Sequence, residues 1–529
     1  MLPSAVNQSS QNSSSHSRSA GWAHWLTLLL LFSAGTVLRF RSVDSKPFWF
    51  DEAFSVEVAR LDWRNFLHVI WWREANMSLY YLLLRAWLEF GQSPLFIRSL
   101  SVVISAATLP AIYWVAKLLY DRPVALLATA LLACNAYSVR YAQEARSYAL
   151  FLLLATLGSG FLISWVREME HDLRSQSATS RSRASLGNGY VITSVLAAYA
   201  HLYAILLIAA HLIAVRISRQ HENNPGRSRE IRRAWQAIGL GVMPLLIFVA
   251  KTGAGPIRWI QRPGLADLFE FFEHLSGGHN WVLPVVVAAA CVAAVVPLGR
   301  SLWSQAQSWE VWRCQFLLLW LLFPVAVTVL LSIARPVFLP RYMIFCLPAM
   351  LILAAAGLAR LNRWLLPPAL FAILLLGVQG TAFVYGHDFD TERDAIGQAA
   401  NFILDRTQCG DAMIFHIAET RVPYEFFRSL RAATNTASPQ FTRPLGPDML
   451  FPRHGAGLDY RDFTGKPTAE FVRTAAAGRG RIWVMLMHNG PAGNPDPTTR
   501  MLSEVLGETF PSVRRWQFPK VEVSLYSRE

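Results

Sequence analysis

The chain has 529 residues, of which 53% are hydrophobic and 16% charged, and its mean hydropathy is +0.29. Water-soluble proteins of this size carry about 25% charged residues, so a soluble globular enzyme is excluded. The net charge of +14 fits the positive cytoplasmic loops of a membrane protein, and no nucleic-acid partner is needed to explain it. The five cysteines have neither metal-ligand spacing nor the pattern of a disulfide framework.

The N-terminus combines a polar segment with a long apolar one. Residues 1–21 are rich in serine and poor in apolar side chains, which predicts a disordered cytoplasmic tail. The apolar run from Trp22 to Phe40 has the length of a full membrane span and no clear small-x-small cleavage site. We therefore expect an uncleaved first helix rather than a signal peptide.

Further apolar segments predict membrane spans up to residue 385. They are 96–117, 124–138, 147–166, 190–215, 236–250, 281–298, 314–334, 342–359 and 364–384. The segment 190–215 separates two arginine-rich loops that should both be cytoplasmic. Two short helices that turn near His201, each about 20 Å long, resolve this conflict. The prediction is a polytopic α-helical membrane protein with about 11 transmembrane helices over residues 22–385.

The loop charges predict the orientation. Sixteen Lys and Arg residues lie in the five loops 117–123, 167–189, 216–235, 299–313 and 360–363, which should be cytoplasmic. The charges that flank the first helix favour the reverse orientation, but the five loops outweigh them. The N-terminus is then inside, and a large loop at 41–95 is outside. Its apolar stretches at 66–72 and 79–90 predict helices that lie in the membrane interface.

Residues 386–529 are polar enough to form a soluble C-terminal α/β domain, which the same topology makes extracytoplasmic. The patterns predict helices at 391–406 and 497–507, strands at 412–417 and 482–487, and a hairpin at 512–527. Residues 435–470 are rich in Pro, Gly, Thr and Asp, which indicates a long loop.

The strongest candidate for chemistry is the segment 48–54 (FWFDEAF), which sets Asp51 and Glu52 among aromatic residues. Burial beside apolar rings raises the pKa of a carboxyl group and makes it a better proton acceptor. The alternative is that both acids favour the start of an interfacial helix through its dipole.

A second candidate is the turn 140–148 (RYAQEARSY), which holds Tyr141, Gln143, Glu144, Arg146 and Tyr148. Arg and Tyr also anchor helix ends at the interface, which is the alternative explanation. The predicted topology places Glu144 on the same side of the membrane as Asp51, and this favours a shared site.

A third candidate is Arg341 in the segment 335–342 (RPVFLPRY). It could hold a phosphate at headgroup depth, or it could be an interfacial arginine that reaches toward water. His201 and His211 are better explained as hydrogen-bonded core residues than as metal ligands. The predicted spans carry no Asp, Glu, Lys or Arg near their middles, which argues against ion-coupled transport.

Four segments together resemble a known family. They are 49–53 (WFDEA), 79–85 (LYYLLLR), 141–148 (YAQEARSY) and 340–342 (PRY). The pattern is similar to bacterial members of the dolichyl-phosphate-mannose-protein mannosyltransferase family (glycosyltransferase family 39), which have the GT-C fold and include aminoarabinose transferase relatives. The likeness covers the membrane region to about residue 385.

This resemblance implies transfer of a sugar from a polyprenyl-phosphate carrier to a lipid, glycan or protein acceptor at the outer face of the cytoplasmic (inner) membrane. It makes Asp51, with Glu52 beside it, the catalytic candidate and places Glu144 in the same site. Many members have His-Pro-Pro where this chain has 76–78 (NMS), so no role of that histidine carries over.

Chemical reasoning then assigns the remaining roles. We expect Asp51 to act as general base in an inverting transfer, and Glu144 to position the acceptor or a cation. Arg146 and Arg341 would bind the carrier phosphate, and Tyr81, Tyr141, Gln143 and Tyr148 would line the substrate site. No cofactor is certain, and a divalent metal ion is possible because two acids can serve with or without one. The alternatives are a transporter or flippase of lipid-linked glycans, and a membrane anchor that displays the tail as a binding module.

Overall fold

The structure is a computed structural model of the chain. It describes residues 9–46, 48–72, 74–175, 180–218, 225–253, 260–278, 281–299, 301, 308–386, 395–435, 446–452, 465–487 and 495–528. The chain divides into two compact units. We call Met1–Arg41, Ser101–Gln143 and Ser147–Phe383 the helical unit, and Ser42–Leu100, Glu144–Arg146 and Val384–Glu529 the loop–tail unit.

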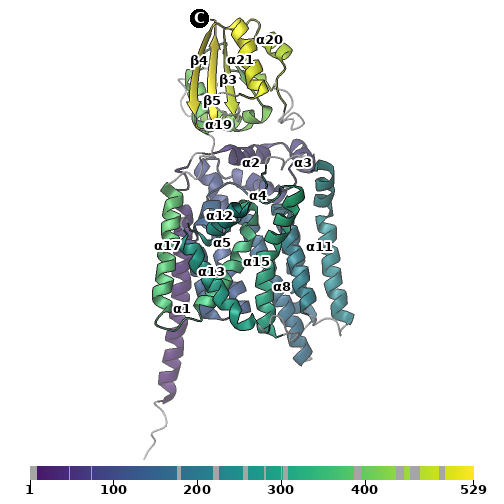
Figure 1. Cartoon of the computed structure of the whole chain (residues 1–529), viewed down its shortest axis with the longest axis vertical. Helices are drawn as coiled ribbons and strands as arrows, with labels where there is room; N and C mark the ends of the chain where they lie inside the picture. Colours follow the sequence, from purple (N-terminus) through teal and green to yellow (C-terminus); the bar gives the residue numbers. More distant parts are fainter. Residues whose placement is uncertain are drawn as a thin grey trace, which may run out of the picture. The chain divides into compact units, whose positions relative to one another are not determined.

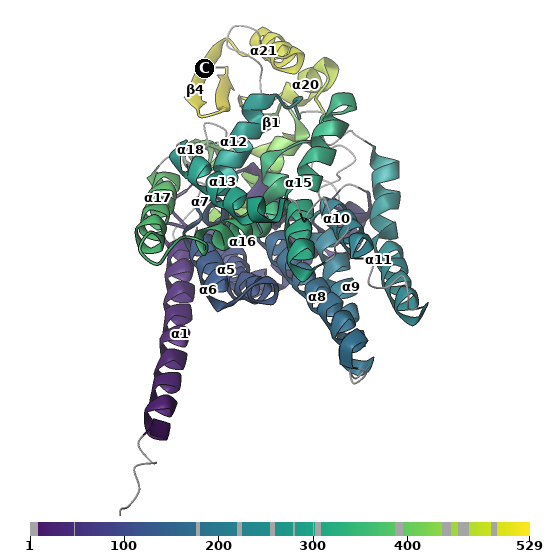
Figure 2. The ribbon, with the colours of Figure 1, turned by 60° about the horizontal axis from the view of Figure 1, so that its bottom comes forward.

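The helical unit is built from long helices that run beside one another, as α8, α11 and α15 do in Figure 1. Its elements are α1 (Ser9–Phe40), most of α5 (Pro94–Leu119), α6 (Arg122–Cys134), α7 (Ala136–Ala142), α8 (Tyr148–Ser175), α9 (Ser180–Ala200), α10 (Ala204–Ile217), α11 (Pro225–Thr252), α12 (Leu265–Ser276), α13 (Val282–Val295), η2 (Val296–Leu298), α15 (Trp309–Ala334), η3 (Pro340–Cys346), α16 (Leu347–Leu358) and α17 (Leu366–Gly386). The turned view of Figure 2 shows α8 and α9 side by side, in agreement with their extensive packing.

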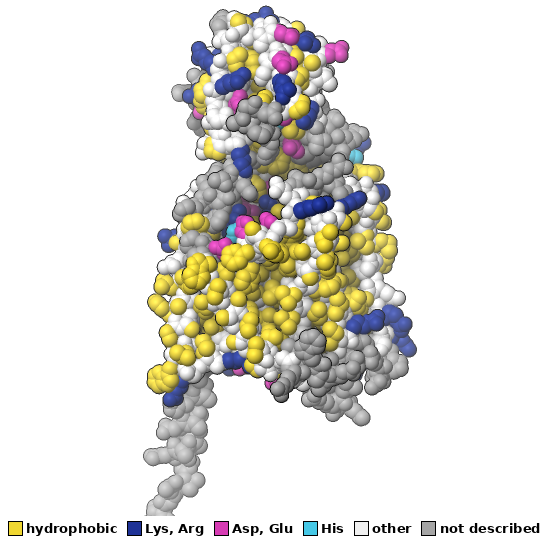
Figure 3. Space-filling model, viewed as in Figure 1, with side chains coloured by type: hydrophobic (Ala, Val, Ile, Leu, Met, Phe, Trp, Pro, Cys, Tyr) yellow, Lys and Arg dark blue, Asp and Glu magenta, His cyan; other side chains and the backbone are white. Residues whose placement is uncertain are grey.

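Seven of the described helices are long and apolar enough to cross a membrane, and the bent pair α6–α7 adds an eighth. Large apolar side chains such as Leu322, Leu330 and Ile333 are exposed on them, and hydrophobic side chains cover the visible face of the helical unit in Figure 3. Such a continuous apolar surface requires lipid around it. The chain is therefore a multi-pass membrane protein.

The predicted break near His201 is confirmed, because α9 ends at Ala200 and α10 begins at Ala204. The predicted loops beside it are shorter than expected. Most of 167–189 is helical, since α8 runs to Ser175 and α9 starts at Ser180. Once an apolar segment has nucleated a helix, polar residues can extend it at little cost, because each added residue gains a hydrogen bond.

At the N-terminus, the structure describes α1 from Ser9, and residues 1–8 lie outside the described part of the chain. The disordered cytoplasmic tail over residues 1–21 stays a prediction.

The loop–tail unit holds the helices of the large loop and the α/β tail. Its elements are α2 (Phe50–Arg60), α3 (Trp63–Trp72), α4 (Ser78–Leu88), the start of α5, α18 (Ile396–Arg406), β1 (Ala412–Phe415), η4 (Ala418–Thr420), α19 (Arg421–Asn435), β2 (Asp448–Phe451), α20 (Ala469–Ala476), β3 (Arg481–Met487), α21 (Pro497–Thr509), β4 (Ser512–Phe518) and β5 (Val521–Ser527). The two helices predicted in the loop at 66–72 and 79–90 are present as α3 and α4, and their location in the membrane interface stays a prediction.

The tail forms one five-stranded sheet in the order β2-β1-β3-β5-β4. β1 pairs in parallel with β2 and β3, whereas β5 is antiparallel to β3 and β4. The predicted helices, strands and hairpin are present. The predicted loop 435–470 needs correction, because its described part contains β2, an edge strand of only four residues, too short to show a period.

Candidate active site

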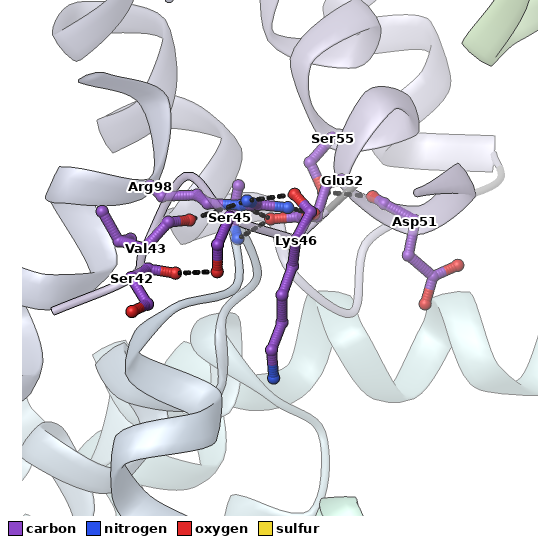
Figure 4. A network of polar contacts seen from close by, with 9 residues as sticks. Ser42, Val43, Ser45, Lys46, Asp51, Glu52, Ser55 and Arg98 are labelled. Carbon is purple, nitrogen blue, oxygen red and sulfur yellow. Dashed lines mark hydrogen bonds and ion pairs between the residues drawn. The ribbon is translucent and has the colours of Figure 1, made fainter. Parts of the chain in front are cut away.

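Asp51 and Glu52 lie in the first turn of α2, where acidic side chains favour the helix dipole. This location agrees with the simpler explanation for the pair, but the two carboxylates have different surroundings. Successive side chains on a helix point about 100° apart. Figure 4 shows the carboxylate of Asp51 pointing away from the network around Glu52.

Glu52 is bound on both carboxylate oxygens by Arg98, from the first turns of α5. The Arg98 Nε donates to Oε1 at 2.8 Å and Nη2 donates to Oε2 at 2.6 Å. Neither side chain is accessible, with exposures of 0% for Glu52 and 1% for Arg98. This two-point geometry uses the planar guanidinium fully, so the pair holds α2 against α5.

The Glu52–Arg98 pair also forms hydrogen bonds with two further segments. Arg98 Nη1 donates to the carbonyl oxygens of Val43 and Lys46 at 2.8 and 2.9 Å, which fixes the chain just before α2. The backbone N–H of Ala145 donates to Glu52 Oε1 at 2.8 Å. Glu52 therefore holds the turn 144–146 beside the start of α2.

Asp51 faces Arg146 from that turn. The Asp51 Oδ2 and Arg146 Nη2 atoms are 3.5 Å apart, and the side chains are 22% and 10% exposed. Arg146 also reaches the carbonyl oxygen of Asp51 at 3.5 Å. This pair is longer and more open than Glu52–Arg98, so its charges are more accessible to a substrate.

A third carboxyl group, Glu74, was missed by the sequence analysis. It follows α3 and is half-buried, and it accepts a hydrogen bond from the hydroxyl of Tyr81 at 3.4 Å. Shielding from water and the charge of Asp51 raise the pKa of Glu74 to about 7, against the opposing effects of Arg146 and Tyr81. The sequence signal that could have found Glu74 is a single acidic residue at the end of a segment that is otherwise rich in aromatic and basic residues.

The loop–tail unit thus brings together Asp51, Glu52, Tyr81 and Arg146 from the predicted set. Glu144 belongs to the same unit, where it is buried at 3% exposure and within electrostatic range of Arg98. Its place beside Arg98 fits a positioning role better than contact with substrate.

The other predicted site residues belong to the helical unit. Gln143 is buried, and its amide donates to the carbonyl oxygens of Arg39 and Arg41 at 3.1 and 2.7 Å. These bonds fix the end of α1. The side-chain amide nitrogen of Gln143 therefore donates its hydrogen bonds within the helical unit.

Tyr141 and Tyr148 form an edge-to-face pair with ring centroids 4.9 Å apart. Tyr148 lies beside His201 at the α9–α10 break, and His201 packs on Tyr342 with centroids 4.7 Å apart. The half-buried Arg341 stacks over the ring of its neighbour Tyr342. The second and third sequence motifs therefore meet in the helical unit around His201.

A metal site was tested against the side chains present. Within the described residues, no group of three or more His, Cys, Asp or Glu side chains is placed to hold a metal ion. Instead, Asp51 forms an ion pair with Arg146, and Glu74 lies within electrostatic range of the same arginine. Among the described residues, this donor set does not fit a metal centre.

Long apolar helices, short helices in the first large loop and a C-terminal α/β tail together define the GT-C fold of membrane glycosyltransferases. Particular solved structures share it. ArnT from Cupriavidus metallidurans in the apo state aligns with a TM-score of 0.61 over 97% of this chain and 99% of that chain, at 13% identity. The same protein bound to undecaprenyl phosphate aligns with a TM-score of 0.57 over 96% and 98%, at 13% identity.

An oligosaccharyltransferase from Archaeoglobus fulgidus, crystallised with Zn and sulfate, has a TM-score of 0.50 over 87% of this chain and 67% of that chain, at 11% identity. At these identities the likeness establishes the fold. No protein-family model and no curated protein sequence matches the chain.

Proposed function

We propose that the chain is a glycosyltransferase that moves a sugar from a polyprenyl-phosphate carrier to an acceptor hydroxyl. The observation that carries this proposal is the open Asp51–Arg146 pair, held in place by the closed Glu52–Arg98 pair within a GT-C fold. The likeness to ArnT, which was crystallised with undecaprenyl phosphate, supports a polyprenyl-linked sugar donor.

In the proposed reaction, Asp51 accepts the proton of the acceptor hydroxyl as its oxygen attacks the anomeric carbon. The bond between that carbon and the phosphate oxygen breaks, and the polyprenyl phosphate leaves with the electron pair. Arg146 stabilises the charge that develops on the phosphate. Attack from the face opposite the leaving group inverts the anomeric centre.

Glu52 and Arg98 act here as positioning residues. Glu52 holds the backbone of Ala145, and this fixes the next residue, Arg146, opposite Asp51. A shift of about 1 Å in such a group costs about a hundredfold in rate. Arg341, Tyr141 and Tyr148 keep their predicted substrate-binding roles as proposals.

The carrier's polyprenyl chain needs an apolar surface. A cavity of about 560 Å³ in the helical unit is lined by the end of α10 at Ile217 and by apolar residues of α15, including Leu318 and Leu322. We assign part of the polyprenyl chain to this cavity.

The topology belongs to the same proposal. The seven long apolar helices, the bent pair α6–α7, and α9, α10 and α13 make eleven crossings, with the loop 41–95 and the tail 386–529 outside the cytoplasmic membrane. Single cysteines introduced near positions 50 and 143 should both react with an impermeant thiol reagent from outside. Labelling from opposite sides would contradict the proposal.

The direct test is transfer in vitro by the purified protein from a panel of polyprenyl-phosphate sugars, with and without a chelator. Asp51→Asn should lower the rate by about 100- to 10,000-fold, the usual contribution of a general base. Asp44→Asn changes an exposed acid of the same loop and should retain activity. Full transfer by Asp51→Asn would refute the base assignment. Movement of labelled carrier between leaflets without a new glycosidic bond would favour a flippase.

A further inference from the structure

A large cavity lies in the tail, away from the residues discussed so far. It has a volume of about 1090 Å³ and is formed by the end of α18, the residues after it, and the strands β3, β5 and β4. We call it the tail pocket. All of its lining residues lie within the loop–tail unit.

The strand register explains why the sheet leaves this face open. Trp483 of β3 pairs with Leu525 of β5, which pairs with Arg514 of β4, so all three side chains share one face. The opposite face is the apolar core with α20 and α21. On the pocket face, α18 packs Phe402 against Trp516 at 4.9 Å and then ends at Arg406. The tail pocket lies beyond the end of this helix.

Four arginines line the tail pocket: Arg406, Arg481, Arg514 and Arg528. Arg481 is paired with Asp411 at 3.1 Å. In the described part of the tail, the other three are exposed and form no ion pair. Asp405 also lines the pocket, but it pairs with Arg431 at 2.6 Å.

Two of the arginines have fixed positions in the pocket, because Arg406 lies 3.8 Å over the ring of Phe402 and Arg481 pairs with Asp411 at 3.1 Å. Arg528 lies instead 5.7 Å over Phe510, a residue of the apolar core. Stacking on a ring leaves the N–H edge of a guanidinium available. Asp411 fixes Arg481 and also accepts the indole N–H of buried Trp483 at 2.8 Å. The polar groups of the pocket are therefore largely preformed, as in small-molecule sites.

We propose that the tail pocket binds a phosphorylated saccharide. Several unpaired guanidiniums in one pocket match an anion with more than one charge, and they bind phosphate through two parallel hydrogen bonds. The half-exposed indole of Trp516 offers a flat apolar surface to the C–H face of a sugar ring. The choice of a saccharide rests on the proposed glycosyltransferase function, whereas the choice of a phosphate rests on the pocket itself.

Cys409 provides a readout that is independent of transfer activity. It lines the tail pocket and is the exposed cysteine of the five, three being buried and Cys291 intermediate. The test is to measure the rate at which a maleimide labels Cys409 in the full-length purified protein as hexose 1-phosphate is added. Bound ligand should slow labelling to a saturable limit.

The control ligands are the unphosphorylated hexose, inorganic phosphate and adenosine monophosphate. Hexose 1-phosphate should protect Cys409 from labelling at a lower concentration than any of these control ligands. Absence of protection, or equal protection by inorganic phosphate or the nucleotide, would overturn the proposal. Vesicles that carry a phosphorylated glycolipid, compared with neutral vesicles, then tell whether the sugar phosphate is presented on a lipid or in solution.

The variants Arg406→Gln and Arg514→Gln should each raise the concentration needed for protection by about tenfold, the contribution of one charge-assisted hydrogen bond. Arg473→Gln is the matched control, because Arg473 is exposed, lies outside the pocket and pairs with Glu508. Unchanged protection in both pocket variants would contradict the assignment. Asp51→Asn should bind hexose phosphate normally, so loss of transfer and loss of tail-pocket binding are distinguishable.

Discussion

Two arginine–carboxylate pairs start from neighbouring residues in one turn of α2, and they differ in nearly every physical property. Glu52 and Arg98 are 2.6 Å apart and inaccessible, whereas Asp51 and Arg146 are 3.5 Å apart and 22% and 10% exposed. Both oxygens of Glu52 are occupied within the protein. The closed pair is inaccessible to a substrate and supplies rigidity. The open pair is accessible because the closed pair holds it in place.

The largest effect should come from breaking the closed pair. Arg98→Gln leaves the carboxylate of Glu52 buried without its counter-charge, which costs about 3–5 kcal/mol in comparable pairs. The protein should melt at a clearly lower temperature in detergent, measured by thermal unfolding. Arg146→Gln is the matched control and should leave the melting temperature almost unchanged. Equal melting of both variants would remove the distinction between the pairs.

An intermediate effect should come from the open pair. Arg146→Gln removes a charged hydrogen bond to the phosphate of the sugar donor, so the KM for this donor should rise by about tenfold or more. Arg146→Lys keeps the charge but loses the two-point geometry. Its KM for the sugar donor should therefore lie between those of Arg146→Gln and the wild type. Steady-state transfer kinetics measure this. A change confined to the KM for the acceptor would place Arg146 elsewhere in the site.

The smallest effect should be a pH dependence that arises from Glu74, whose pKa is raised to about 7. Below this pH Glu74 is neutral, and above it the carboxylate competes with the donor phosphate for Arg146. The KM for the sugar donor should therefore rise between pH 6 and 8, by less than about tenfold because the site is partly hydrated. Glu74→Gln should flatten this dependence. Glu89→Gln, an exposed acid of the same loop, should not.

Much of the fold could be predicted because the hydropathy of the segments and the spacing of their apolar residues directly indicate helices and strands. The interfacial helices, the break at His201 and the tail hairpin each have a local signal. α19 was missed although its sequence is strongly amphipathic and Val422, Tyr424 and Phe426 are buried along it.

The active site was only partly predictable. The sequence places Asp51 and Glu52 side by side with the same chemistry, and nothing local says which one is buried. The answer depends on Arg98, 46 residues away, and on the backbone of Ala145. Glu74 depends in the same way on Tyr81 and Arg146, which only the folded chain brings near it.

The hydrogen bond from Ala145 to Glu52 joins residues that are 93 positions apart. A ribosome therefore completes the six helices from α2 to α7 before this bond can form. Until then Glu52 must stay hydrated, since an ionised carboxylate does not enter an apolar interior alone. Chains truncated before residue 145 would lack the partner that orders the first loop, so this region can mature only after the first 145 residues have been made.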